Sequence, residues 1–242
     1  MKSQLLSLLL IVFAPAVFAQ QPYQLTWPRE LAIAGGSSAG IGVSLMLRPN
    51  TKAFTPDEIA ALDISDVPRF DLYATRHYSA AARRASDIML FTSIAIPALL
   101  FVDADIRRDA PEVAVIVGEV FLLNTALTQL TKELTHRPRP FNYNPDVPPD
   151  PKLERDARLS FFSGHTSTTA AMCFATAKIW TDYHPDSGWK PVVWISATAI
   201  PLTVGYLRMK GGKHFLSDVL TGFIVGSATG WLVPQLHRQR GN

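Results

Sequence analysis

The sequence predicts an all-α fold, a helical bundle of about six core helices that we expect to form a polytopic membrane protein. Six apolar stretches follow residue 20, and most of them are too long for strands and lack the alternation that half-buried strands show. Polar and proline-rich segments separate them. The stretches are Leu31–Leu47, Ile88–Val102, Val113–Thr131, Thr166–Trp180, Val192–Leu207 and Val219–Val233.

The length of these stretches leaves two architectures open. Each stretch is shorter than the roughly 20 apolar residues that a helix needs to cross a bilayer. The chain is therefore either a small polytopic membrane protein or a soluble helical bundle with an apolar core. The first stretch, Leu31–Leu47, contains the sequence AGGSSAG, which is a poor helix former. We therefore expect this stretch to lie at the membrane interface or half-buried, without crossing fully.

The first twenty residues resemble a secretory signal peptide. Lys2 provides the charged start, Leu5–Phe13 the apolar centre, and cleavage is expected after Ala19. The single cysteine, Cys173, excludes an intrachain disulfide, and export without disulfides fits a bacterial envelope protein. The predicted organisation is a signal peptide at 1–19, an N-terminal interfacial or peripheral segment at 20–87, and a catalytic helical domain at 88–242.

Two polar segments interrupt the apolar pattern. In the first, 48–87, Thr55, Pro56 and Glu58 form a capping-box pattern that predicts a short surface helix. In the second, 136–160, six prolines exclude a long helix. Because long irregular loops in compact domains are often functional, the second segment and its flanks are the first place to look for a site.

Residues able to carry chemistry gather in three clusters at the ends of predicted helices. Each cluster has an ordinary alternative explanation: a snorkelling lysine, a Ser/Gly helix cap beside an incidental histidine, and a structural His–Asp pair. In the third cluster, His214 and Asp218 are four residues apart, which would place them on one helix face. The clusters are Lys132 with Arg139-Pro140, then Ser163-Gly164-His165, then Arg208 with His214 and Asp218.

Together the clusters supply what phosphoryl transfer without a metal requires. Lys132, Arg139 and Arg208 can neutralise phosphate oxygens, the arginines in bidentate fashion. A helix that starts at Gly164 exposes unpaired N–H groups, and such a helix end binds anions. One neutral histidine can attack phosphorus, and a second, protonated histidine can protonate the leaving oxygen.

These motifs resemble the signature of the type 2 phosphatidic acid phosphatase (PAP2) superfamily, which reads K-x6-RP, then PSGH, then SR-x5-H-x3-D. The chain matches nine of the eleven fixed positions in order, between Lys132 and Asp218. Phe162 replaces the family's proline, which is mostly a backbone feature. Leu207 replaces the family's serine, and this removes one possible phosphate donor.

The resemblance implies a role for each matching residue. His214 would be the nucleophile that forms a phosphohistidine, and Asp218 would orient and polarise it. His165 would protonate the leaving alcohol and then activate water. No metal and no cofactor is implied. The phosphate ligands would be Lys132, Arg139, Ser163, Gly164 and Arg208.

Charge and composition limit the partners. The net charge is only +3 and the basic residues are dispersed, which does not favour nucleic acid. The expected partners are a phospholipid or isoprenoid phosphate substrate and the membrane, while the oligomeric state stays open. Glu119, inside an apolar stretch, is interpreted as a buried polar contact. The histidines outside the signature, interpreted as surface residues, are His77, His136, His184 and His237.

Basic residues also suggest an orientation. Arg107, Arg108 and the basic C-terminal tail are expected in the cytoplasm. This places the catalytic clusters at the periplasmic face of a bacterial inner membrane. If the signal is cleaved, the mature N-terminus lies in the periplasm, and Leu31–Leu47 then does not cross the membrane. If the first twenty residues stay in the cytoplasm, Leu31–Leu47 crosses the membrane.

Several functions are compatible with such a site. The leading hypothesis is a metal-independent phosphatase acting on phosphatidate, phosphatidylglycerol phosphate, isoprenyl diphosphate or lipid A phosphate. The main alternative is a soluble periplasmic acid phosphatase acting on small phosphomonoesters. Haloperoxidase chemistry on the same site is a weaker alternative because it needs bound vanadate. A non-enzymatic membrane scaffold is weaker because all the key catalytic residues are present. Phosphate transfer to a second lipid instead of water stays open.

Overall fold

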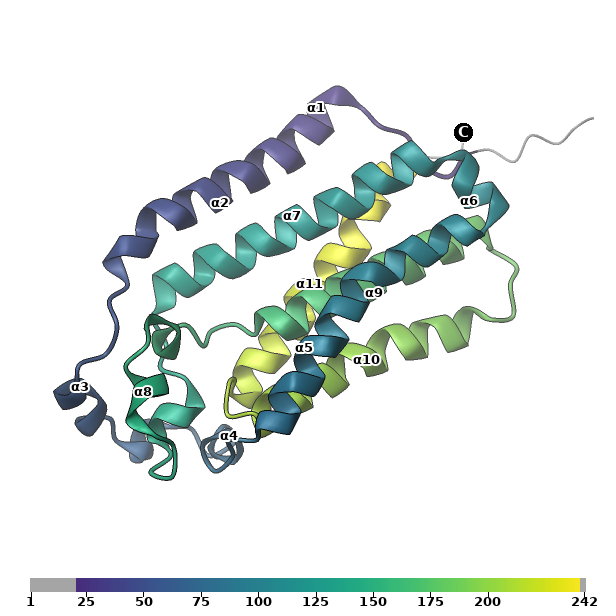
Figure 1. Cartoon of the computed structure of the whole chain (residues 1–242). Coiled ribbons are helices and arrows are strands. Elements are labelled where there is room, and N and C mark those ends of the chain that lie inside the picture. The colour runs from purple at the N-terminus through teal and green to yellow at the C-terminus, as the bar shows by residue number, and fades with distance from the viewer. Residues whose placement is uncertain (1–20, 240–242) are drawn as a thin grey trace, which may run out of the picture.

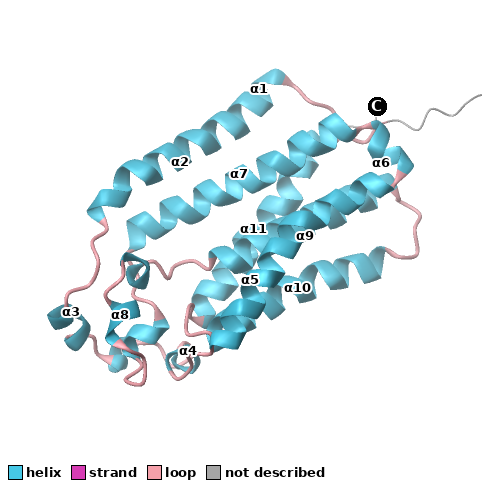
Figure 2. Ribbon diagram, in the orientation of Figure 1, coloured by secondary structure: helices cyan, strands magenta, loops and turns pink. Residues whose placement is uncertain are grey.

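The protein is helical throughout the part that a computed structural model describes, residues 21–239 of 242. Within those residues, extended pairing is limited to one bridge, between Tyr23 and Arg238. The predicted signal peptide falls on residues 1–20, which lie outside the described residues. The all-α class predicted from the sequence is confirmed (Figure 2).

Long helical segments run back and forth between the two ends of the bundle (Figure 1). In the first segment a π-helical turn, Leu31–Gly35, joins α1 to α2, and a 3-10 stretch, Ile96–Val102, extends α5. The long helices are α1 (Trp27–Glu30) with α2 (Gly36–Leu47), α5 (Ala80–Ala95), α7 (Ala110–Thr135), α9 (Gly164–Tyr183), α10 (Lys190–Lys210) and α11 (Leu216–His237). The connections contain α3 (Pro56–Ala60), α4 (Leu72–Thr75), α6 (Ala104–Arg108) and α8 (Pro149–Lys152).

Each predicted apolar stretch lies inside one of these segments, but the helices are longer than the stretches. Polar residues complete their first turns: Ser163 caps α9, for example. The capping box of Thr55 and Glu58 is present at the start of α3, as predicted. As a result, segments that looked short in the sequence are long and apolar enough to cross a membrane. They are Trp27–Asn50, Ala80–Val102, Ala110–Tyr143, Lys190–Lys210 and Leu216–His237.

Large apolar side chains cover the outer faces of these segments. Phe91 is 70% exposed, Ile195 67% and Ile224 64%. Soluble proteins rarely leave extended apolar surface of this kind in water, whereas a bilayer surrounds it with hydrocarbon. The chain is therefore a polytopic helical membrane protein, and the soluble bundle left open by the sequence does not fit this surface.

Helix α11 packs directly against the central helix, α9, through a row of glycines. A Cβ at Gly222 would lie 2.6 Å from the carbonyl oxygen of Ser163, and one at Gly226 would lie 2.1 Å from that of Ser167. Gly230 repeats this close contact one turn further on. Small residues at this spacing let helix backbones approach closely in membranes. The contact holds the start of α9 beside the start of α11, where two of the sequence clusters lie.

The N-terminal segment runs the length of the bundle beside α7 (Figure 1). At one end Tyr23 pairs with Arg238, and at the other the Thr51 hydroxyl donates to Oε2 of Glu133 at 2.7 Å. An interfacial placement was expected from its weak helix formers, but the π-helical turn keeps the helix continuous. The geometry supports the alternative in which this segment crosses. Helix α5 also begins at Ala80, ahead of the domain boundary expected at residue 88.

Candidate active site

The three sequence clusters lie at the end of the bundle that carries the loop between α7 and α9 (Figure 1). Lys132 is in the last turn of α7 and Arg208 in the last turn of α10, while His165 is the second residue of α9. Arg139 lies on the loop after α7, and His214 lies on the short connection from α10 to α11. Helix ends from four parts of the chain thus contribute to one site.

The spacing of His214 and Asp218 suggested that both lie on one helix face, but the structure places them differently. His214 lies two residues before α11 begins, and Asp218 is in the first turn of that helix. The Asp218 carboxylate turns back instead, so that Oδ2 lies 3.6 Å from Nδ1 of His214. The same Oδ2 accepts hydrogen bonds from the Phe215 N–H at 2.9 Å and from the Ser160 hydroxyl at 2.5 Å. Asp218 therefore caps the helix, and its carboxylate lies next to the Nδ1 side of the His214 ring.

Arg137, outside the signature, fixes the second oxygen of Asp218. Its Nη1 lies 2.5 Å from Oδ1 of Asp218, and its Nη2 lies 2.8 Å from Asp71, a residue that precedes α4. Arg137 directly precedes Pro138 and Arg139 directly follows it, so the loop after α7 supplies two arginines with different tasks. Arg137 holds the carboxylate, and Arg139 faces the histidine.

The other ring nitrogen of His214 faces the signature arginine. Nη1 of Arg139 lies 3.1 Å from Nε2 of His214. A guanidinium can only donate, so this Nε2 carries a lone pair and the proton of the neutral ring sits on Nδ1, towards Asp218. Burial and the neighbouring Arg139 hold the pKa of His214 well below its usual range. His214 is therefore a neutral imidazole with its free nitrogen beside a cation.

Asp156 and Lys213 extend the cationic site, and neither was identified from the sequence. Nη2 of Arg139 lies 2.7 Å from Oδ1 of Asp156, and Nζ of Lys213 lies 3.3 Å from Oδ2. Burial alone would raise the pKa of Asp156, but Arg139 and Lys213 hold it well below its usual range. Asp156 is thus a stable anion that positions Arg139. Lys213 had a sequence signal, because it directly precedes His214.

His165 makes its contact with a residue outside all three clusters. Its Nε2 lies 2.8 Å from Oδ1 of Asp87 on α5, and Nη1 of Arg208 lies 3.2 Å from the same oxygen. Burial and the charge of Arg208 lower the pKa of His165 to about 4, although Asp87 acts in the opposite direction. Asp87 directly precedes an apolar stretch, and only the fold brings it to the site.

Ser163 and Gly164 shape the start of α9. The Ser163 hydroxyl is buried, accepts a hydrogen bond from the Thr166 N–H at 3.4 Å and lies 2.9 Å from the Thr166 hydroxyl. It acts as the helix cap here, so its expected contact with phosphate stays a prediction. A Cβ at Gly164 would lie 3.0 Å from Cγ2 of Thr128 and 4.0 Å from Nζ of Lys132. The second cluster therefore lies directly against the first.

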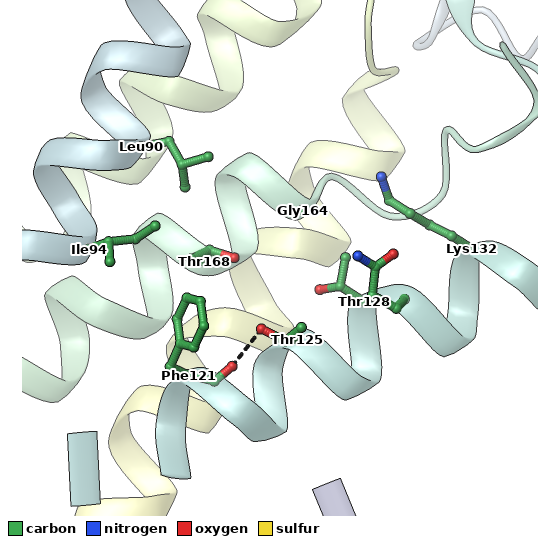
Figure 3. A pocket seen from close by; sticks show the side chains of 9 residues that line it. Leu90, Ile94, Phe121, Thr125, Thr128, Lys132, Gly164 and Thr168 are labelled. Atoms are coloured by element: carbon green, nitrogen blue, oxygen red, sulfur yellow. Dashed lines mark hydrogen bonds between the residues drawn. The ribbon is translucent and has the colours of Figure 1, made fainter. Parts of the chain in front are cut away.

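A cavity of about 280 Å³ opens beside Lys132, between α5, α7 and α9 (Figure 3). Apolar side chains line its far part, and Lys132 and Gly164 lie at the end next to the site (Figure 3). The cavity combines an apolar space with a cationic end. Its lining is Leu90, Ile94, Phe121, Thr125, Thr128, Gln129, Lys132, Gly164 and Thr168.

The fold and this site define a helical membrane protein with a cationic pocket around two histidines. The chain belongs to the PAP2 superfamily, whose family model matches residues 113–242, more than half of its length. The match confirms the family resemblance read from the three motifs, and it covers all of them.

Comparison with curated proteins finds relatives named as lipid phosphatases. Phosphatidylglycerophosphatase B of Bacillus subtilis (strain 168) is 34% identical over 115 residues, which are 47% of this chain and 53% of that protein. Phospholipid phosphatase 1 of Rattus norvegicus is 32% identical over 83 residues, 33% of this chain and 29% of that protein. Phospholipid phosphatase 2 of Homo sapiens is 36% identical over 76 residues, 30% and 26% respectively. This chain spans about half or less of the length of these relatives.

One solved structure shares the fold over most of the chain. It is described as the first transmembrane PAP2 type phosphatidylglycerolphosphate phosphatase from Bacillus subtilis. The alignment covers 83% of this chain and 94% of that chain, with a TM-score of 0.50 and 23% sequence identity. At this identity the likeness concerns the helical fold.

Proposed function

We propose that this protein is a metal-independent phosphatase that removes phosphate from membrane lipids through a phosphohistidine. One observation supports the proposal most directly: the unprotonated Nε2 of the buried His214 lies 3.1 Å from Arg139. Lys132, Arg208 and His165 are also close enough for their charges to act on the His214 ring. This arrangement suits a nucleophile held beside a phosphate-binding site.

The first step transfers the phosphoryl group to the protein. Nε2 of His214 attacks phosphorus, a P–N bond forms, and the bond from phosphorus to the alcohol oxygen breaks. Asp218 stabilises the positive charge that develops on the ring, as the acid of a catalytic triad does. His165, in its protonated form, gives a proton to the leaving oxygen. The products are the free alcohol and the phosphohistidine.

The second step restores the enzyme. Neutral His165 accepts a proton from water as the water oxygen attacks phosphorus, and the P–N bond breaks. Inorganic phosphate leaves and His214 is neutral again. In both steps Lys132, Arg139 and Arg208 offset the charge on the equatorial oxygens, and the exposed N–H groups at Gly164 add donors.

The low pKa of His165 fits this sequence of events. The free site holds several cations and disfavours a further positive charge on the ring. A bound phosphate dianion reverses the local charge, so His165 gains its proton when substrate binds. The general acid is then charged only when a leaving group is present.

A lipid is the substrate class that we propose. The apolar cavity beside Lys132 offers space for the first part of an acyl or prenyl chain next to the phosphate site. The names of the three relatives concern phospholipids, and one of them names phosphatidylglycerophosphate. Phosphatidate, phosphatidylglycerol phosphate, isoprenyl diphosphate and lipid A phosphate are the lipids to test.

We further propose that the catalytic end faces the periplasm of a bacterial inner membrane. The catalytic loops carry basic residues of their own, and Arg137, Arg139 and Lys213 among them are paired with carboxylates of the site. The orientation therefore rests on Arg107, Arg108 and Arg238, which lie at the opposite end of the bundle (Figure 1). Because Tyr23 pairs with Arg238, this orientation puts residue 21 in the cytoplasm and requires the first twenty residues to stay uncleaved on that side. Cleavage after Ala19 would give the reverse orientation, so N-terminal mass spectrometry of the membrane-bound protein tests both predictions.

The activity test measures phosphate release from the lipid panel and from a soluble aryl phosphate by detergent-purified protein in EDTA. We expect release from at least one lipid, inhibition by vanadate, and no release by His214→Ala. Lys190→Ala, at the opposite end of α10, serves as the matched control and keeps activity. Release of phosphate that depends strictly on an added divalent metal would contradict the mechanism. Release from the aryl phosphate alone would contradict the lipid assignment.

A further inference from the structure

Three ionisable side chains meet at the end of the bundle away from the catalytic loops. Glu30 is the last residue of α1, Glu119 lies within α7, and His237 is the last residue of α11. One ligand atom of each residue lies within 4.8 Å of the other two. Glu119 precedes Lys132 by thirteen positions on one helix, which separates this cluster from the phosphate site by ~20 Å. The proposed phosphatase reaction does not use these residues.

The cluster is buried, contrary to the interpretation of His237 as a surface residue. His237 is fully buried and Glu119 is 3% exposed. The sequence suggested a surface position because His237 begins the basic tail, but the pairing of Gln24 with the His237 carbonyl covers this end of α11. Ionisable residues inside membrane-spanning segments are costly and usually have a specific function.

Glu30 accepts hydrogen bonds from Arg29 and Thr26, but the other two members of the cluster face one another with unsatisfied polar atoms. Among residues 21–239, neither carboxylate oxygen of Glu119 has a hydrogen-bond partner, and neither has Nε2 of His237. Buried polar groups are almost always paired in native proteins, and an unpaired buried carboxylate is particularly unfavourable. The arrangement therefore points to a cationic ligand.

Outer contacts aim the three side chains at one point. Nδ1 of His237 lies 2.8 Å from the carbonyl oxygen of Val233. It therefore carries the ring proton, and the Nε2 lone pair faces the carboxylates. Oε1 of Glu30 accepts from Nη2 of Arg29 at 2.9 Å and from the Thr26 N–H at 2.6 Å. Histidines and carboxylates that bind metals are held by outer contacts of this kind.

The distances suit a small divalent ion. Nε2 of His237 lies 3.1 Å from Oε2 of Glu119 and 3.6 Å from Oε2 of Glu30. Two ligands bound at ~2.1 Å and at a tetrahedral angle are roughly 3.4 Å apart. The separation to Glu119 is slightly shorter than this value, and the separation to Glu30 is slightly longer. Charge agrees as well, since two carboxylates beside one guanidinium leave a net negative charge in this buried place.

We propose that Glu30, Glu119 and His237 bind one divalent transition-metal ion of the Zn²⁺ type. One imidazole and two carboxylates are a nitrogen and oxygen set that such ions accept, with water in the fourth position. The ion joins three helices that are far apart in the sequence. In particular it fastens the N-terminal segment Trp27–Asn50, of which only 11% is buried in the bundle. Its role is to hold this segment against α7 and α11.

The test uses full-length protein in detergent, stripped with EDTA and then titrated with Zn²⁺ in metal-free buffer without substrate. We expect one bound Zn²⁺ per chain by calorimetry and by elemental analysis, with a higher melting temperature. Glu119→Gln and His237→Gln should each lower the affinity at least tenfold. His184→Gln is the matched control, because His184 also faces a carboxylate, Asp103, at 3.1 Å, and it should bind as wild type does.

Phosphatase activity of each variant in EDTA shows whether it is folded. The variants at positions 119 and 237 lie outside the catalytic site and should keep activity at low temperature. Wild-type protein that binds no stoichiometric Zn²⁺ would overturn the proposal, as would full binding by both variants. Neither result would affect the phosphatase assignment, which is measured with substrate. Loss of activity in wild type, with zinc still bound, would contradict only the phosphatase assignment.

Discussion

The carboxylate of Asp87 lies 2.8 Å from Nε2 of His165 and connects it to Arg208, whose Nη1 is 3.2 Å from the same oxygen. Helix α5 thus reaches a site whose other residues come from α7, α9, α10, α11 and the loops. The pairing gives the proposed general acid a fixed orientation and a source of negative charge. Asp87 acts through His165 and is a positioning residue.

Replacing Asp87 by Asn tests this role. Because Asp87 favours the protonated ring, its loss should make His165 harder to protonate. We expect kcat to fall about tenfold or more, within the range that general acids contribute. The basic limb of the pH profile should move to lower pH. Asp105→Asn, which removes an exposed partner of Arg108, is the control, and an unchanged pH profile in Asp87→Asn would rule out the positioning role.

The pH dependence of the wild-type enzyme carries a separate prediction. In the free protein the pKa of His165 is lowered to about 4, so the protonated form becomes scarce as pH rises above that value. The pH dependence of kcat/KM reports the pKa values of the free enzyme, and that of kcat reports those of the enzyme–substrate complex. As pH rises, kcat/KM should therefore begin to decline at a lower pH than kcat. The neutral state of His214 does not limit either one near neutrality, since its pKa lies well below the usual range. Identical basic limbs for the two profiles would contradict this account.

The sequence could predict the helices and select candidate site residues because both depend on local patterns. Apolar runs located every long helix, and the motif spacing selected His165, His214 and Asp218, which the fold brings to one end of the bundle. The partners that reach these residues across the fold could not be predicted in this way. Asp87 comes from α5 and has no neighbour in the sequence that marks it. Arg137 lies two residues before Arg139, but the spacing does not show that it reaches Asp71 and Asp218.

The glycines of α11 are a second feature that depends on the fold. Gly226→Ala should lower the stability in detergent by about 1–3 kcal/mol, because the new Cβ would lie 2.1 Å from the Ser167 carbonyl oxygen. Gly42→Ala is the control in α2, where nothing lies within 4 Å of the new Cβ. It should leave the melting temperature unchanged or raise it, since alanine favours helix. Equal melting temperatures for the two variants would show that the glycine row does not set the α9–α11 contact.

The apolar cavity beside Lys132 makes a prediction about substrate length. Leu90 lines the cavity (Figure 3), and a larger side chain there would occupy the space proposed for the lipid chain. Leu90→Trp should therefore lower kcat/KM about tenfold or more for a long-chain lipid phosphate. This loss corresponds to ~1.4 kcal/mol of transition-state binding, which removal of a few buried methylene contacts can cause. Release from a short-chain, water-soluble phosphate ester should change little, because its phosphate reaches the cations without using the cavity.

A matched variant separates this effect from general damage to α5. Ile88 lies on the same helix but is 67% exposed towards the surrounding lipid, so Ile88→Trp adds the same bulk outside the cavity. Both enzymes should be compared with long-chain and short-chain substrates in the same detergent. Loss of long-chain activity in Leu90→Trp alone would support entry of the chain between α5 and α7. Equal activity of the two variants on the long-chain lipid would show that the chain lies elsewhere.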